Sequence, residues 1–170
     1  MLKSLTVIIL TYKTSEKILS NCIKSIHQSA NIIIVENSNN INFKKKIKKK
    51  YPKIKVYLTG RNLGYGGGNN YGLKRVKSKY ALICNPDLTF KKNFFKEIKN
   101  YLKSKLNFYL IGISYKPGSV WETCGYLKEF NTKDNKLKSK ISDKSIKEVD
   151  WIIGCSFLII QSTSFIDLSD

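Results

Sequence analysis

Asp87 is the residue of this sequence best placed to bind a cation, because it follows an apolar segment and a proline. That segment, residues 80–84 (YALIC), is continuously apolar, as in a strand covered on both faces. Pro86 cannot donate a backbone hydrogen bond, so the strand should end before it. Ligands of open α/β sheets lie beyond the carboxyl ends of strands, which makes Asn85 and Asp87 candidate binding residues. A lone aspartate after a strand is also a common turn or cap residue, and the local sequence leaves both readings open.

A second candidate site is the glycine-rich stretch 60–70, GRNLGYGGGNN. Its four glycines within residues 64–68 would let backbone approach a ligand closely and would open a helix whose N-terminus favours anions. A dinucleotide fingerprint would need a glycine at position 69, where Asn69 stands, and a P-loop would need a G-K-[ST] ending. A plain loop has little need of so many glycines, so a role in ligand binding is favoured over a purely structural one.

The elements that would position these residues alternate between strands and helices. Ser15 is a candidate N-cap for the first helix, and an amphipathic stretch is expected at residues 71–76. Strand, helix, strand order is typical of right-handed βαβ units. We therefore expect one α/β domain with a mostly parallel sheet flanked by helices. The expected strands are residues 5–10, 31–35, 54–58, 80–84, 108–114 and 151–160.

Length and composition favour a globular protein. The chain has 170 residues, of which 42% are hydrophobic, enough for one domain with a sizeable core. Its net charge of +19 raises nucleic acid or an anionic membrane as a partner. The run at residues 44–50 (KKKIKKK) could bind phosphate or acidic lipid, although the exposed face of a short helix is the favoured reading. No recognised nucleic-acid-binding motif is present, so we expect no nucleic-acid partner, and peripheral contact with an anionic membrane remains open.

The cysteines and apolar runs bear on localisation. Cys22, Cys84, Cys124 and Cys155 form no C-x-x-C pair, so they are expected to be thiols in a reducing compartment. The longest apolar segment, residues 151–160, is about half the ~20 residues of a membrane-spanning helix. We expect a cytoplasmic protein, either soluble or peripheral at the inner face of the membrane.

Five short motifs occur in an order that is informative as a set. They are VIILTY at the end of the first strand, IIIVENSNN at the second, NLGYGGGNNYGL after the third, NPDL after the fourth and DWIIGCSFLI near the end of the chain. In this order and spacing they resemble the family-2-type glycosyltransferases of the GT-A fold, and more closely their rhamnosyltransferase-like branch. The resemblance spans nearly the whole chain, and it implies a Rossmann-like GT-A domain over residues 1–170.

The resemblance also implies site residues. Glu36 stands where the family usually has aspartate, and Asn85-Pro86-Asp87 replaces its D-x-D turn. Asp87 would then be the main protein ligand of Mg²⁺ or Mn²⁺, with diphosphate oxygens and water completing the coordination. The implied nucleotide-binding residues are Thr11, Tyr12, Glu36, Asn37, Asn62, Gly64, Gly68, Asn69 and Asn85.

The implied reaction is inverting transfer of a sugar, rhamnose being one candidate, from a dTDP- or UDP-sugar to a glycan or lipid-linked acceptor. The family's base belongs to an acidic pair downstream of the last strand, where this sequence has only Asp167 and Asp170 in an unrelated context. We therefore expect the base beyond Asp170, with the fold incomplete at its C-terminus and the chain either a fragment or a degenerate enzyme. Should this chain itself turn over, Asp150 and Glu122 are the first candidates for the base.

A different class of function shares all of these motifs. A non-catalytic nucleotide-sugar-binding module would keep the donor-binding residues and lack turnover, so only an activity measurement separates the two. A nucleotidyltransferase is disfavoured, because residues 11–17 (TYKTSEK) lack the glycine-rich basic loop that it would need after the first strand.

Overall fold

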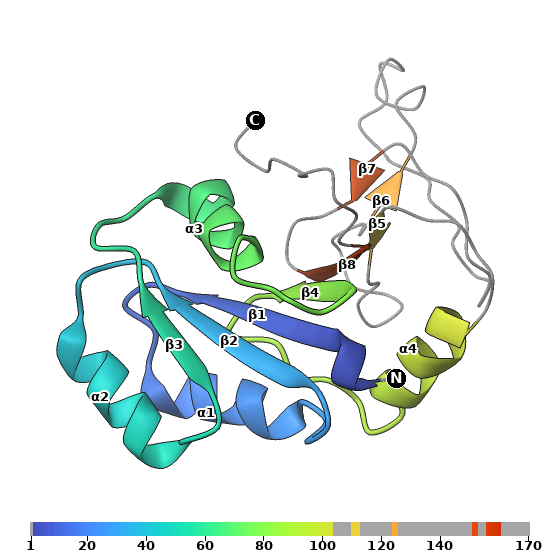
Figure 1. The fold of residues 1–170 in the computed structure, drawn as a ribbon, viewed down its shortest axis with the longest axis horizontal. Coiled ribbons are helices and arrows are strands. Elements are labelled where there is room, and N and C mark those ends of the chain that lie inside the picture. The colour runs from blue at the N-terminus through green and yellow to red at the C-terminus, as the bar shows by residue number, and fades with distance from the viewer. Residues whose placement is uncertain (1, 104–109, 113–123, 126–150, 153–155, 161–170) are drawn as a thin grey trace, which may run out of the picture.

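The protein is a mixed α/β structure in which helices flank one sheet (Figure 1). The computed structural model describes residues 2–103, 110–112, 124–125, 151–152 and 156–160. Six of the described strands form this sheet in the order β3-β2-β1-β4-β8-β5, and β6 pairs with β7 separately. The elements are a 3₁₀ turn (Leu2–Ser4), β1 (Leu5–Thr11), α1 (Glu16–Ser25), β2 (Asn31–Glu36), α2 (Ile41–Lys50), β3 (Lys55–Leu58), α3 (Gly64–Leu73), β4 (Tyr80–Cys84), α4 (Phe94–Lys103), β5 (Leu110–Gly112), β6 (Cys124–Gly125), β7 (Trp151–Ile152) and β8 (Ser156–Ile160).

Strands β1 to β4 form the parallel part of the sheet. β1 lies between β2 and β4 and is parallel to both, and β3 is parallel to β2. Thr11 at the end of β1 pairs with Glu36 at the end of β2, and Ile9 pairs with Cys84 at the end of β4. The residues that follow these three strands therefore meet at one edge of the sheet, as the sequence predicted for a parallel arrangement.

The C-terminal strand reverses the direction of the sheet. β8 is inserted between β4 and β5 and is antiparallel to both. The single strand expected at residues 151–160 is wrong, because β7 pairs with β6 in a separate ribbon whereas β8 joins the main sheet. The hydroxyl group of Ser156 donates a buried hydrogen bond of 3.0 Å to the carbonyl oxygen of Ile83.

The sheet is covered on both faces, which explains the continuous apolar runs of its central strands. Ile9 and Leu82 belong to the core layer beneath α1, α2 and α4. Ile8 and Ile83 point the opposite way, into the layer beneath α3. Each of these four side chains is fully buried. Alternate residues of a strand thus enter two different hydrophobic layers.

Helix α3 begins at Gly64, so the glycine-rich stretch opens a helix, as expected, and the helix continues through most of its glycines. Glycine is a poor helix former by about 1 kcal/mol relative to alanine, and packing must compensate for it. A Cβ atom on Gly68 would lie 2.5 Å from Cδ1 of Leu10, and one on Gly72 would lie 2.7 Å from Cγ2 of Ile8. These glycines share one helix face, and their lack of a side chain lets α3 approach β1 closely.

Helices α1 and α2 start at side-chain caps. Ser15 Oγ accepts a 3.3 Å hydrogen bond from the backbone N–H of Ile18, which confirms the predicted cap of α1. Asn40 Oδ1 accepts one of 2.9 Å from Phe43 at the start of α2. Helices α1 to α4 each contain ten residues. Within the part of the chain that the structure describes, no helix is long and apolar enough to cross a membrane.

Several expectations fall outside the described residues. They concern the thiol of Cys155 and the carboxyl groups of Glu122, Asp150, Asp167 and Asp170.

Candidate functional site

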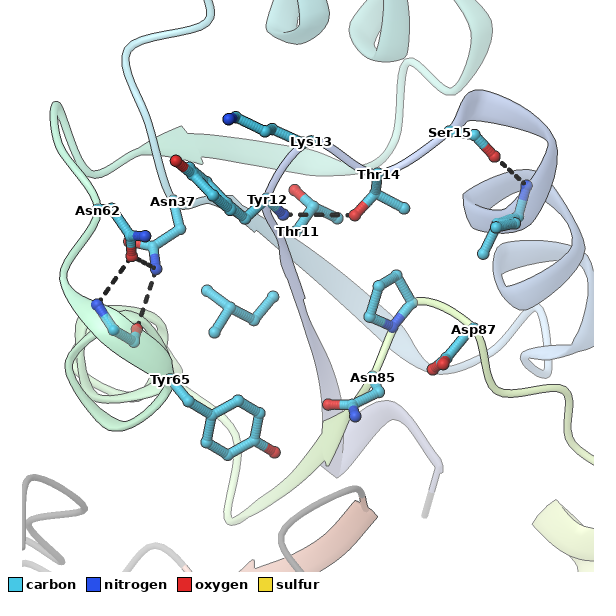
Figure 2. Close-up of a pocket in the computed structure, with 14 residues that line it drawn as sticks. Thr11, Tyr12, Lys13, Thr14, Ser15, Asn37, Asn62, Tyr65, Asn85 and Asp87 are labelled. Atoms are coloured by element: carbon cyan, nitrogen blue, oxygen red, sulfur yellow. Dashed lines mark hydrogen bonds between the residues drawn. The ribbon is translucent and has the colours of Figure 1, made fainter.

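A cleft of about 650 Å³ lies at the carboxyl edge of the parallel strands (Figure 2). Its volume is in the range typical of small-molecule sites. The described lining comes from the segment after β1, the ends of β2 and β4, and the start of α3. The lining residues are Leu10, Thr11, Tyr12, Lys13, Thr14, Ser15, Ile18, Asn37, Asn62, Gly64, Tyr65, Asn85, Pro86 and Asp87.

Asn37 organises one wall of the cleft. Its Nδ2 donates hydrogen bonds of 2.9 Å to Asn62 Oδ1 and to the carbonyl oxygen of Gly64. Its Oδ1 accepts a third bond, also 2.9 Å, from the backbone N–H of Leu63. Asn62 Oδ1 in turn accepts from the backbone N–H of Gly64, which has a φ of +73° that favours glycine. These bonds fix the start of α3 against the end of β2 (Figure 2).

Glu36 lies behind this wall, and its carboxyl group accepts hydrogen bonds from two hydroxyl groups. Its side chain is buried, and Oε2 accepts a 2.7 Å hydrogen bond from Thr11 Oγ1. Oε1 accepts one of 2.6 Å from Ser38 Oγ. Burying a carboxyl group is costly unless it is hydrogen-bonded, and here each oxygen has a donor. Glu36 thus holds the ends of β1 and β2 together and is not among the residues that line the cleft.

Asn85, Pro86 and Asp87 form the opposite wall (Figure 2). Asp87 is exposed, and no described residue forms a hydrogen bond or ion pair with its carboxyl group. Asp87 is also the only carboxyl group among the described lining residues. Mg²⁺ and Mn²⁺ sites on nucleotides commonly use one or two carboxylates and take their other oxygens from phosphate and water. One free carboxyl group beside an amide therefore fits a metal held jointly with a diphosphate.

This wall rests on two buried thiols. Cys22 of α1 and Cys84 of β4 have their sulfur atoms 3.7 Å apart, and the Cys84 thiol donates to the carbonyl oxygen of Asn85 at 3.1 Å. Both cysteines are free. The hydrogen bond with Cys22 and burial raise the pKa of Cys84 far above its usual value, so this thiol stays protonated. The two buried thiols act as packing groups beneath the turn.

The rim of the cleft carries aromatic and cationic side chains. Tyr12 is 46% exposed and Tyr65 is 43% exposed. Lys13 has a φ of +52°, and among the described residues it alone has a positive φ without being glycine. Its Nζ lies 5.4 Å from the centre of the Tyr12 ring. A lysine in this conformation is uncommon, and the turn that imposes it directs the chain after β1 across the cleft.

The structure brings most of the expected site residues together. Thr11, Tyr12, Asn37, Asn62, Gly64, Asn85 and Asp87 all line the cleft. Glu36, Gly68 and Asn69 are buried and do not line it. Gly68 packs on Leu10, and no described residue bonds to the side-chain amide of Asn69.

Several lining residues, among them Tyr65, Lys13 and Ile18, were missed by sequence reasoning. Tyr65 stands within the glycine-rich stretch, so a closer reading of that stretch could have found it. Lys13 and Ile18 follow Tyr12 on the turn and on the first helix, and their side chains carry no motif of their own. Only the turn geometry after β1 shows that they reach the cleft.

Solved glycosyltransferases share this fold. A mannosyltransferase from Pyrobaculum calidifontis, solved with GDP-Man and Mn²⁺, superposes with a TM-score of 0.57 and 11% identity, covering 67% of this chain and 36% of that one. Residues 1–349 of TarS from S. aureus give a TM-score of 0.54 and 18% identity over 72% of this chain and 41% of that one. These likenesses establish a GT-A fold.

Sequence comparison identifies the family. The low-salt glycan biosynthesis hexosyltransferase Agl10 of Haloferax volcanii is 29% identical over 190 residues, covering 97% of this chain and 61% of that protein. The chain thus spans less than two thirds of the length of this relative. The family model described as Glycosyl transferase family 2 matches residues 6–168, nearly the whole chain. The protein is therefore a member of glycosyl transferase family 2.

Proposed function

We propose that this protein transfers a hexosyl group, with inversion, from a nucleoside diphosphate sugar to a glycan or lipid-linked acceptor. The observation that carries the proposal is the cleft, in which the carboxyl group of Asp87 has no partner among the described residues and faces the amide-rich wall around Asn37. Two comparisons support the proposal: the chain belongs to glycosyl transferase family 2, and its haloarchaeal relative is named as a hexosyltransferase. We place the reaction on the cytoplasmic side of the membrane, as expected from the sequence.

The wall formed by Asn37 and Asn62 is assigned to the nucleoside. Its three amide hydrogen bonds hold the backbone around Gly64 in place before any ligand binds, which lowers the ordering cost of binding. The exposed ring of Tyr12 offers a surface on which a base can stack. The resemblance to the rhamnosyltransferase-like branch implies a pyrimidine nucleotide, so dTDP- and UDP-sugars, including a rhamnose donor, are the first to test.

Asp87 and Asn85 are assigned to the diphosphate end of the donor. Asp87 would hold Mg²⁺ or Mn²⁺, and Asn85 would supply an amide beside it. A bound divalent cation neutralises charge on the departing diphosphate. The exposed ammonium group of Lys13, the only cation among the described lining residues, can add to this neutralisation.

Inversion follows if the acceptor hydroxyl attacks the anomeric carbon from the side opposite the diphosphate. The hydroxyl proton then passes to a base while the bond between the sugar and the diphosphate breaks. Asp87 is the only described carboxyl group in the cleft, and the proposal commits it to the metal. We therefore assign the base to a residue outside the described ranges.

The test of donor binding is a thermal shift with UDP, dTDP and GDP, each with and without Mn²⁺. A ligand at about 100 times its dissociation constant stabilises the native state by about 2.7 kcal/mol, which raises the melting temperature by about 5–10 °C. Asp87→Ala should remove the Mn²⁺-dependent part of this rise. Glu97→Ala is the matched control, since it deletes an exposed carboxyl group from α4, away from the cleft.

Two outcomes would refute the assignment. One is an equal nucleotide-induced rise in melting temperature of the wild-type protein with Mn²⁺ and with EDTA, which would show that no metal takes part in nucleotide binding. The other is an equal effect of Asp87→Ala and Glu97→Ala. Transfer itself is tested by incubating the protein with Mn²⁺, a panel of nucleotide sugars and a lipid-linked or oligosaccharide acceptor, and following the product by mass spectrometry. Tight nucleotide binding with no transfer or donor hydrolysis would instead indicate a non-catalytic binding module.

A further inference from the structure

Helix α2 carries a strongly basic surface that the proposed transfer reaction does not use. Its ten residues, INFKKKIKKK, include six lysines and no acidic residue. Phe43 and Ile47 are buried in the core layer that α2 covers, so the rotation of the helix about its axis is fixed. Figure 1 shows α2 beside α1, on the outside of the sheet.

The residues opposite Phe43 and Ile47 form one exposed strip. Ile41, Lys45, Lys48 and Lys49 stand at i, i+4, i+7 and i+8, the spacing that places side chains on one helix face. All four are exposed, and Ile41 keeps 52% of its surface accessible. We refer to these four residues as the α2 basic face; it combines three ammonium groups with one apolar side chain.

The charge of this face is not neutralised within the described structure. The ion pair between Lys46 Nζ and Glu16 Oε1, at 3.0 Å, lies on the flank of the helix that meets α1. No carboxyl group of the described residues pairs with Lys45, Lys48 or Lys49. The three ammonium groups are therefore available to an external anion.

We propose that the α2 basic face docks this protein on an anionic phospholipid membrane. Lysine is a hydrated point charge that a negative surface attracts without demanding a fixed geometry, which suits a fluid array of headgroups. Ile41 supplies the apolar contact that surface-bound helices place at the headgroup boundary. Nucleic acid is the weaker match, because the face has no arginine for bidentate phosphate contacts and no aromatic ring for stacking.

The α2 basic face lies near the donor cleft, so docking on a membrane would affect the transfer reaction. Asn37 lines the cleft, and only residues 38–40 separate it from the start of α2. Docking through α2 would bring the donor cleft close to the membrane, where a lipid-linked acceptor is held. This consequence rests on the proposed function, whereas docking itself does not.

The experiment compares binding of the 170-residue protein to vesicles of phosphatidylcholine alone and of phosphatidylcholine mixed with phosphatidylglycerol. Wild type should sediment with the anionic vesicles only, and less so as salt rises. Substituting Lys45→Gln, Lys48→Gln and Lys49→Gln together should weaken binding by about a hundredfold, at roughly fivefold for each lysine. The matched control, Lys91→Gln, Lys96→Gln and Lys99→Gln, removes the same charge from exposed positions in and before α4 and should weaken it only slightly.

Ile41→Ser separates a membrane from other polyanions. It should weaken vesicle binding and leave any binding to duplex DNA or RNA unchanged. If the two triple variants lose the same amount of vesicle binding, net charge alone causes the binding and the α2 basic face is not a specific docking surface. If the wild-type protein does not bind anionic vesicles, the proposal is wrong. Tighter binding to RNA than to vesicles, lost with the α2 lysines, would reassign the face to nucleic acid. Nucleotide-induced thermal shifts of the same variants report on the donor cleft separately, so failure there would count against the proposed function and not against docking.

Discussion

Asn37 Nδ2 and Asn62 Oδ1 lie 2.9 Å apart, so a hydrogen bond joins the end of β2 to the segment before α3, between residues 25 positions apart in the sequence. The same amide group also bonds to the backbone of Leu63 and Gly64. A single side chain therefore sets the distance between two parts of the cleft wall. Its removal should affect stability and nucleotide affinity together.

Asn37→Ala is expected to lower the free energy of unfolding by about 1–3 kcal/mol, because it removes three partly buried hydrogen bonds, each typically worth about 0.5–1.5 kcal/mol. Nucleotide affinity should fall as well, since the start of α3 is no longer held. Urea denaturation and nucleotide titration measure the two effects. Asn39→Ala is the control, as this side chain is exposed on the same turn. If both variants lose the same stability, the Asn37 bonds do not hold the wall.

Gly72→Ala should destabilise the protein even though alanine is the better helix former. The new Cβ would lie 2.7 Å from Cγ2 of Ile8 and 3.0 Å from Cγ2 of Val35. Both neighbours are β-branched and held in one rotamer, so they cannot move aside cheaply. Overpacking costs about 1–3 kcal/mol, and the better helix propensity of alanine offsets about 1 kcal/mol of this cost, which leaves a net loss of up to about 2 kcal/mol.

The contact with Ile8 can be isolated with a double-mutant cycle. In Ile8→Ala the methyl group that meets the new Cβ is absent, so Gly72→Ala should cost less in that background than in wild type. Urea unfolding of the four proteins gives the coupling energy. Additive costs would mean that α3 shifts away from β1 and that no close approach of helix and strand is required.

The sequence predicted the central strands well, because a strand buried on both faces reads as a continuous apolar run. The resemblance to family-2 glycosyltransferases implied that Tyr12, Asn37 and Asn85 share one site, and the structure brings them together because the carboxyl ends of parallel strands share one edge. The sequence predicted that the glycines of α3 open a helix but placed the amphipathic stretch at residues 71–76, whereas α3 spans Gly64–Leu73, because packing on β1 overrides glycine's low helix propensity. The sequence could not separate β7 from β8, because their partners β6 and β4 are distant in sequence.

A different cause explains why some of the expected site residues do not line the cleft. Successive side chains at a strand end point to opposite sides, so Glu36 turns inward to hydroxyl groups whereas its neighbour Asn37 reaches the cleft. On α3 the same distinction depends on helix rotation, which places Gly68 against Leu10. A motif identifies a stretch of chain, and the three-dimensional packing decides which of its residues a ligand can meet.

Thr11→Val should destabilise the protein by about 1.5–3 kcal/mol, the usual range for a hydrogen bond to an ionised group. The variant keeps the shape of the buried side chain and removes the donor that lies 2.7 Å from Glu36 Oε2. Thr11→Ser, which retains the hydroxyl group, should recover most of the loss. Thr89→Val, at an exposed position, is the control. Urea denaturation measures the free energy of unfolding of each variant. If Thr11→Val is as stable as wild type, one hydrogen-bond donor is enough for the Glu36 carboxyl group.

The buried thiol of Cys84 predicts a loss of stability in alkali. Its pKa is raised above the usual value of 9.0 by the hydrogen bond with Cys22 and by burial, so the folded protein keeps a proton that the unfolded chain releases. Below a pH of about 9 both states hold this proton, and Cys84 contributes no pH dependence. Above it the unfolded state binds fewer protons, so the free energy of unfolding falls by about 1.4 kcal/mol per pH unit from this group.

Cys84→Ala provides the comparison that isolates this effect. The variant loses a constant amount of stability to the cavity it creates, and it lacks the thiol whose proton is at issue. The gap in free energy of unfolding between wild type and variant should therefore be constant near neutral pH and narrow as pH rises past about 9. Lysine and tyrosine groups titrate in both proteins and cancel in the difference. Urea unfolding at a series of pH values measures the gap, and parallel curves up to a pH of about 10.5 would show that the folded protein releases the Cys84 proton as readily as the unfolded chain does.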